Sequence, residues 1–197
     1  MAHLTDNPAA ISFMGWLNYA FLLAMMIVIA GILTAAMTLQ YGNGELPCPL
    51  CLLQRVALFG VCFGIIQSFR HGFSYQNTGI SLLFATFLLI VSARQTLLDI
   101  YPRPGHEYIG SAVFGIHMPV WSVIIAVCIL TAYALKLTVL GGGKNLGDIA
   151  AGQYPAISKI ASIVGLYIVL IGLINTVSVL VQCGLNQCHT FNYQLLQ

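Results

Sequence analysis

The chain has 197 residues, of which 59% are hydrophobic and only 6% are charged, with seven Lys or Arg and five Asp or Glu. Soluble domains carry about 25% charged residues, so this composition excludes a water-exposed globular protein. The net charge is only +2, which leaves no basic patch for several phosphates and excludes nucleic-acid binding. The sequence therefore predicts an all-α, polytopic protein of the lipid bilayer.

Five apolar runs are long enough to span a bilayer as helices, which takes about 20 residues. Run length and helix breakers define them, since a helix in lipid can be apolar on every face. The first run is too long for a signal peptide and follows no Lys or Arg, so we expect it to remain in the protein. The runs are Met14–Leu39, Cys51–Phe69, Ile80–Leu98, Pro119–Leu140 and Ile157–Val181. We expect a four-helix bundle over residues 1–140, followed by a linker, a fifth transmembrane helix and a tail over 141–197.

An odd number of spans places the two termini on opposite sides of the membrane. Positive charges favour the cytoplasmic side, and a cytoplasmic N-terminus places four of the seven there: Arg70, Lys136, Lys144 and Lys159. The other side then holds the remaining three: Arg55, Arg94 and Arg103. We therefore expect a bacterial inner-membrane protein with a cytoplasmic N-terminus and a periplasmic C-terminus. In either orientation, the loops after the first and third helices and the C-terminal tail face the same side.

This topology divides the six cysteines into two pairs at helix ends and two residues within helices. Cys48 and Cys51 open the second helix, whereas Cys183 and Cys188 follow the fifth. Parity places both pairs on the same face of the membrane. The remaining two fall near the middle of the second and fourth helices, where we expect them to pack as small core residues: Cys62 and Cys128.

A Cys-x-x-Cys sequence at a helix start has a physical reason to be redox-active. The first-turn N–H groups and the helix dipole stabilise a thiolate, and Cys51 is in that position. Arg55 lies one helical turn further along the same face. A fixed cation near lipid suits a quinone site, because quinone reduction develops negative charge on the quinone oxygens. Arg94, with its neighbour Gln95, is a second candidate for contact with the quinone, although Arg94 also fits a snorkelling interface residue.

Non-enzymatic interpretations of the four same-side cysteines stay open. One is that plain disulfides staple the loops, although a ring that spans residues 48–51 restricts the unfolded chain little. Another is a zinc or copper site formed by all four cysteines with His189, which an oxidising compartment disfavours. Metal analysis and thiol counting distinguish these interpretations from a redox enzyme.

The sequence around Cys48 resembles a known family. Residues 47–60 read PCPLCLLQRVALFG, which closely resembles the quinone-side motif of the disulfide bond formation protein B (DsbB) family, a C-x-L-C followed by Arg and an A-L-F-G-like stretch. Tyr101–Pro104 resembles the end of that family's third helix, and Gly115–Trp121 resembles the entry to its fourth. The similarity covers roughly residues 46–140.

The resemblance implies an enzyme that moves electrons from a periplasmic, DsbA-like thioredoxin-fold thiol oxidase through protein disulfides to a membrane quinone, either ubiquinone or menaquinone. It implies that Cys51 forms the charge-transfer partner of the quinone, that Cys48 exchanges with the second cysteine pair, and that Arg55 polarises the quinone. The nearest enzyme alternative is a vitamin K epoxide reductase-like protein. In that family the shuttle pair precedes the C-x-x-C, whereas here the C-x-x-C comes first.

The chain departs from the DsbB pattern in the place of its second cysteine pair. That family has four helices and keeps the pair between helices 3 and 4. Here residues 99–118 contain no cysteine, and a fifth helix instead ends near Cys183 and Cys188 on the same face. Our hypothesis is that this tail replaces the loop pair as the shuttle that meets the soluble partner.

Overall fold

The computed structural model describes residues 8–42, 44, 47–100, 112–140 and 151–183. Within these ranges, five helices are long and apolar enough to cross a membrane: α1 (Pro8–Gly42), α2 (Pro49–His71), α3 (Tyr75–Ile100), α4 (Met118–Leu140) and α5 (Pro155–Cys183). Each of the five predicted runs lies inside one of these helices. The predicted all-α, polytopic membrane fold is therefore confirmed.

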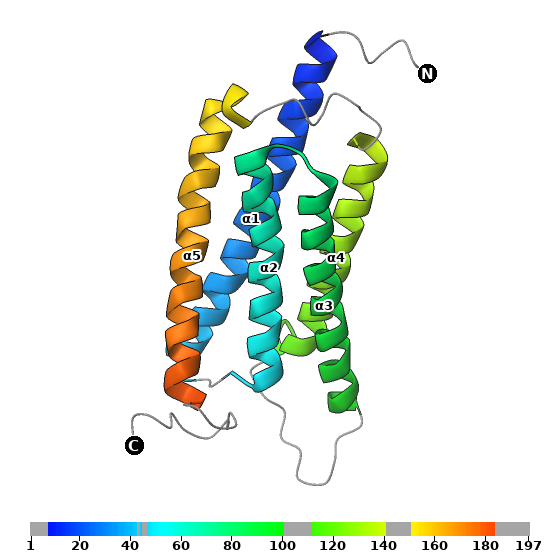
Figure 1. Ribbon diagram of the computed structural model, residues 1–197. Coiled ribbons are helices and arrows are strands. Elements are labelled where there is room, and N and C mark those ends of the chain that lie inside the picture. Colours follow the sequence, from blue (N-terminus) through cyan, green and yellow to red (C-terminus); the bar gives the residue numbers. More distant parts are fainter. Residues whose placement is uncertain (1–7, 43, 45–46, 101–111, 141–150, 184–197) are drawn as a thin grey trace.

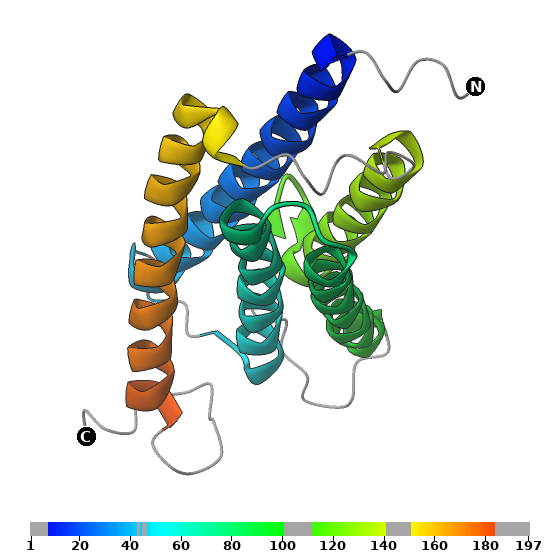
Figure 2. The ribbon, with the colours of Figure 1, turned by 45° about the horizontal axis from the view of Figure 1, so that its top comes forward.

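The helices run up and down as one bundle with α2 near its centre (Figure 1). α2 packs against α3, α1 and α5, and α4 packs mainly against the far side of α3. In Figure 2, α5 and α4 lie on opposite sides of the α2–α3 pair. α2 begins at the same end of the bundle at which α3 and α5 end (Figure 1), so the predicted parity is confirmed. The division at residues 140 and 141 stays a prediction, while α5 itself packs along α1 and α2.

Two small elements lie outside the long helices. The hairpin of β1 (Ala112–Val113) and β2 (Ile116–His117) is antiparallel and leads directly into α4. Its turn residues, Phe114 and Gly115, have φ angles of 52° and 76°, and positive φ at both central positions is typical of a type I′ turn. A short 3₁₀ helix, η3 (Ala151–Gln153), precedes α5.

Lys136, which the orientation argument counts as a cytoplasmic charge, is buried in the bundle. It is 5% exposed, and its Nζ lies 5.2 to 5.9 Å from the ring centroids of Phe73, Tyr133 and Phe21. Cation–π attraction to these rings offsets part of the desolvation of the ammonium group. Because the positive-inside rule concerns charges in loops and at helix ends, Lys136 carries less weight in that argument. The orientation of the chain stays a prediction.

The two mid-helix cysteines have different surroundings. Cys62 is fully buried in the core, as predicted. Cys128 is exposed on the outer face of α4, so the prediction that it packs in the core is wrong. The reason is that lipid tails are as apolar as a protein core, and an apolar residue in a spanning helix is stable on either face.

The close approach of α2 and α3 depends on two glycines of α2. A Cβ atom at Gly60 would overlap the ring of Phe84, and one at Gly64 would overlap Ser81 and the backbone carbonyl oxygen of Asn77. Small residues at a helix interface let two backbones approach closely, which is a main source of helix association in lipid. The α2–α3 pair therefore requires glycine at both positions.

We expect Gly64→Ala to destabilise the protein by about 1–3 kcal/mol, because the added methyl group meets backbone atoms of α3 that cannot move independently. The measurement is thermal unfolding in detergent. Gly79→Ala is the matched control, since a Cβ atom at Gly79 has nothing within 4 Å. Equal unfolding temperatures for the two variants would contradict the packing argument.

Candidate redox site

Cys48 and Cys51 form a disulfide at the start of α2. Cys48 is the N-cap residue, with extended backbone angles, and Pro49 occupies the first helical turn, where its missing N–H is not needed. The backbone N–H of Cys51 donates a hydrogen bond to Cys48 Sγ at 3.1 Å. Cys48 is buried and Cys51 is half-buried. The backbone N–H of Cys51 therefore faces Cys48 Sγ. After reduction of the disulfide, this N–H would stabilise a thiolate at Cys48.

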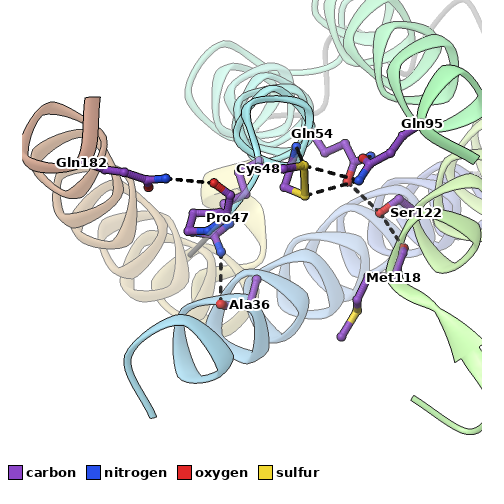
Figure 3. Close-up of a disulfide and its surroundings, with 10 residues drawn as sticks. Ala36, Pro47, Cys48, Gln54, Gln95, Met118, Ser122 and Gln182 are labelled. Atoms are coloured by element: carbon purple, nitrogen blue, oxygen red, sulfur yellow. Dashed lines mark hydrogen bonds between the residues drawn. A yellow bond between two sulfur atoms is a disulfide. The ribbon is translucent and has the colours of Figure 1, made fainter. Parts of the chain in front are cut away.

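A chain of side-chain hydrogen bonds from α4, α2 and α3 ends on the two sulfur atoms (Figure 3). Gln95 Nε2 on α3 donates to Cys48 Sγ at 3.3 Å and to Cys51 Sγ at 3.5 Å. Gln95 Oε1 accepts a hydrogen bond from Gln54 Nε2 at 2.8 Å. Gln54 Oε1 accepts one from Ser122 Oγ at 3.0 Å. Ser122 Oγ also lies 3.3 Å from the carbonyl oxygen of Met118, whereas the amide donors of Gln54 and Gln95 are both oriented toward the disulfide.

The direction of this chain favours reduction of the disulfide. Each donor polarises the next group, so the amide N–H of Gln95 presents positive charge to the sulfur atoms. A thiolate accepts such hydrogen bonds more strongly than a disulfide does, because charged acceptors form the stronger bonds. Gln95 and Gln54 are 6% and 8% exposed, so little water competes. The arrangement therefore stabilises the reduced state relative to the oxidised state.

Arg55 is a buried cation held between α1, α2 and α5. It is 8% exposed. Its Nη1 donates to Gln40 Oε1 at 2.6 Å and to Asn175 Oδ1 at 3.0 Å, and its Nη2 donates to the carbonyl oxygen of Ala36 at 3.1 Å. Nη1 also lies 3.3 Å from Met37 Sδ. An arginine inside a spanning helix requires such partners.

The end of α5 lies next to the loop that precedes α2. Gln182 is fully buried, and its Nε2 donates to the carbonyl oxygen of Pro47 at 3.0 Å (Figure 3). Cys183, the next residue, is 4% exposed and disulfide-bonded. Cys188 and His189 lie outside the described residues. The structure thus brings Cys183 to the same end of the bundle as Cys48 and Cys51, as the sequence predicts.

The remaining predicted site residue, Arg94, is exposed on α3. Its neighbour Gln95 faces inward and contacts the disulfide. Sequence reasoning did not identify several polar residues that surround the site. The sequence does contain a signal for them. An amide or hydroxyl side chain inside an apolar span costs free energy unless it is hydrogen-bonded, so such residues are expected to have partners. These residues are Gln40, Gln54, Ser122, Asn175, Ser178 and Gln182.

The helices and the site define a multi-pass membrane protein with a disulfide at the start of a spanning helix. Residues 18–107 match the family model described as "Disulfide bond formation protein DsbB". Over residues 18–107, the chain is therefore similar to the DsbB family. The match begins earlier and ends earlier than the span from residue 46 to residue 140 that the sequence predicts. The resemblance of Gly115–Trp121 stays a prediction.

Curated proteins of the same description are similar to this chain. The disulfide bond formation protein B of Nitrosomonas europaea is 33% identical over 85 residues, which cover 41% of this chain and 52% of that protein. The protein of the same name from Aromatoleum aromaticum is 32% identical over 87 residues (42% and 52%), and that from Paracidovorax citrulli is 41% identical over 73 residues (36% and 42%). The chain thus spans about half the length of the curated relatives it matches. No solved structure matches it.

We expect Gln95→Leu to make the Cys48–Cys51 disulfide harder to reduce. Loss of the donor to sulfur removes about 1 kcal/mol of stabilisation from the reduced state, or roughly a fivefold change in equilibrium constant. Equilibration with dithiothreitol followed by thiol trapping measures this constant. Gln76→Leu, an exposed glutamine on the same helix, is the control. An unchanged constant in Gln95→Leu would show that the amide chain does not act on the disulfide.

Proposed function

We propose that the protein is an inner-membrane thiol:quinone oxidoreductase that reoxidises a periplasmic thioredoxin-fold dithiol oxidase. Electrons would pass through two cysteine pairs, Cys183 with Cys188 and Cys48 with Cys51, to a membrane quinone. The curated relatives carry the name "Disulfide bond formation protein B", which supports the disulfide-forming part of this proposal. We propose the quinone, the partner and the order of the steps in addition.

The observation that carries the proposal is the contact between α5 and the loop before α2. Gln182 binds Pro47 directly, so the residues that follow them in sequence, Cys183 and Cys48, belong to adjoining segments. Both cysteines are only 4% exposed, which limits access of a soluble protein to either sulfur atom. Exchange between the two pairs within one molecule therefore suits Cys48 better than direct attack from outside.

The electron balance of the proposed cycle is simple. The partner's dithiol reduces the Cys183–Cys188 disulfide by thiol–disulfide exchange, so the partner leaves with a disulfide and the pair becomes a dithiol. A second exchange passes the same two electrons and two protons to Cys48 and Cys51. These two thiols then lose two electrons and two protons to the quinone, which becomes a quinol, and the Cys48–Cys51 disulfide forms again. Each turn therefore produces one disulfide and one quinol.

Residues of this chain fit a quinone beside Cys51. Reduction places negative charge on the quinone oxygens, and Arg55 supplies a fixed positive charge one helical turn from Cys51. Gln95, whose amide contacts both sulfur atoms, supplies a neutral donor on the opposite side of α2 from α5. Arg94 is exposed on α3, where it is available to a ligand that approaches from the lipid. We propose that Gln95 and Arg94 contact the quinone and that Arg55, whose guanidinium is directed toward α1 and α5, polarises it.

We propose the orientation that the charge count favours. The N-terminus is cytoplasmic, and the C-terminus and both cysteine pairs are periplasmic, where an oxidising compartment keeps disulfides formed. The alternative metal site requires four thiolates. Three of these four cysteines are disulfide-bonded in the structure, which favours the redox interpretation. Metal analysis of the purified protein is therefore a control in the experiment below.

The experiment is anaerobic addition of decylubiquinone to the fully reduced protein in detergent, with quinone absorbance and trapped thiols followed together. We expect one quinol for each Cys48–Cys51 disulfide formed. The thiols of Cys62 and Cys128 should not change. Cys48→Ser/Cys51→Ser is the control and should reduce no quinone. An unchanged thiol state in the unmodified protein, or a stoichiometric bound metal, would refute the mechanism.

Replacement of the second pair separates the two half-reactions. We expect Cys183→Ser/Cys188→Ser to abolish oxidation of a reduced thioredoxin-fold partner, while Cys48 and Cys51 still react with decylubiquinone at the normal rate. Stopped-flow quinone absorbance and mass-spectrometric thiol counting of the partner measure the two steps. Cys62→Ala/Cys128→Ala controls for loss of cysteines in general. Normal oxidation of the partner by the double serine variant would overturn the proposed role of the tail.

A further inference from the structure

The Ser122 hydroxyl on α4 is the outer end of the hydrogen-bond chain that reaches the disulfide (Figure 3). A hydroxyl group has one hydrogen, yet Ser122 Oγ lies 3.0 Å from Gln54 Oε1 and 3.3 Å from the carbonyl oxygen of Met118. Met118 lies four residues earlier in α4, so helical geometry already directs the backbone N–H of Ser122 at the same carbonyl. The shorter distance and this competition at Met118 both favour donation of the hydroxyl hydrogen to Gln54.

The next two groups in the chain are amides, and each amide has an acceptor side and a donor side. In the observed orientation, Gln54 Nε2 donates to Gln95 Oε1 at 2.8 Å, which leaves Gln95 Nε2 to donate to Cys48 Sγ at 3.3 Å. If Gln54 were turned over, its oxygen would meet the oxygen of Gln95 unless that amide turned as well. Turning both would place the Gln95 oxygen against the sulfur atoms. The two amides therefore change orientation together.

These two orientations act differently on the two redox states. A thiolate binds an N–H donor strongly and is repelled by the partial negative charge of an amide oxygen. A disulfide sulfur is only a weak acceptor, so it distinguishes the two orientations much less. Cys48 is 4% exposed and Gln95 is 6% exposed, so little water can replace the missing donor. A group that selects the N–H orientation therefore favours the reduced pair.

We infer that Ser122 is a positioning residue for the redox centre, whose hydroxyl selects the orientation of the Gln54 and Gln95 amides that presents an N–H to the sulfur atoms. This inference rests on the proposed function, in which Cys48–Cys51 accepts electrons. Among the described contacts, Ser122 reaches the sulfur atoms only through the two amides. The family match covers Gln54 and Gln95 but ends at residue 107, before α4. α4 thus contributes to the site through this hydroxyl.

Ser122→Ala removes the hydroxyl and tests the inference. We expect the equilibrium constant for reduction of Cys48–Cys51 by dithiothreitol, measured by thiol trapping of these two cysteines, to fall about threefold. Without the hydroxyl, the oxidised protein populates both amide orientations, whereas a thiolate still requires one of them. The N–H that it binds is also less polarised. Ser122→Thr keeps the hydroxyl and should restore the constant.

Thr138→Val is the matched control on the same helix. Thr138 is exposed, and its described hydrogen bond is to the carbonyl oxygen of Ala134, so the constant should not change. A fall of less than about 1.5-fold in Ser122→Ala would overturn the inference. An equal fall in Ser122→Thr or in Thr138→Val would also overturn it, since the Ser122 hydroxyl would then not be the cause.

A double-mutant cycle with Gln95→Leu separates positioning from a merely structural role. Gln95→Leu removes the amide through which Ser122 acts, so a further Ser122→Ala should leave the dithiothreitol constant unchanged. A disturbance of α4 packing would instead lower the constant by the same factor in both backgrounds, and that result would contradict the inference. The thermal unfolding temperature of Ser122→Ala in detergent should stay close to that of the unmodified protein, because one neutral hydrogen bond is lost.

Failure of the proposed function is distinguishable from failure of this inference. If the unmodified protein reduces no decylubiquinone, the proposed function is wrong, but the dithiothreitol equilibrium requires no quinone and still tests Ser122. A threefold lower constant that disappears in the Gln95→Leu background would then support the inference alone. If quinone reduction is normal and Ser122→Ala keeps the original constant, only the inference about Ser122 fails.

Discussion

The absence of water in the hydrocarbon layer is the constraint on which this structure depends. A buried polar group there costs free energy unless it finds a partner inside the protein. With 6% charged residues, the chain has few such groups. Most buried amides of the described helices lie toward the end that holds the Cys48–Cys51 disulfide, namely Gln40, Gln54, Gln95, Asn175 and Gln182, whereas Asn18 lies near the start of α1. The hydrogen bonds that satisfy Gln54, Gln95 and Arg55 are therefore the same ones that connect five helices around the sulfur atoms. The same hydrogen-bond network therefore pairs the buried polar groups and surrounds the disulfide.

Two sides of this network act differently on the disulfide. From α3 and α4, the chain through Gln54 and Gln95 delivers a neutral N–H donor directly to sulfur. From α1 and α5, Gln40 and Asn175 accept hydrogen bonds from Arg55. The hydrogen bond from Gln95 favours the reduced pair, because a thiolate accepts it more strongly than a disulfide does. The hydrogen bonds of Gln54, Gln95 and Arg55 thus come from four helices besides α2, of which α4 and α5 lie outside the family match.

Much of the fold could be predicted from the sequence, because bilayer thickness fixes the length of a spanning helix. The number of spans before each loop then determines the side of the membrane on which that loop lies. The five spans and the shared end of Cys48, Cys51 and Cys183 followed from these two rules. The partners of Arg55 did not, because an apolar spanning helix gives no periodic signal for which face turns inward. The same ambiguity made the prediction for Cys128 wrong. The α2–α3 contact at Gly64 and the hairpin turn at Phe114 depend on tertiary geometry that local pattern does not contain.

The central claim is that the two cysteine pairs form a relay within one molecule, and disulfide trapping tests it most directly. In a variant with Cys51→Ser, Cys188→Ser, Cys62→Ala and Cys128→Ala, only Cys48 and Cys183 remain. Mild oxidation in membranes should then join these two in an intramolecular disulfide, detected by mass spectrometry after proteolysis. Two free thiols after oxidation, or only dimers linked between molecules, would contradict the relay.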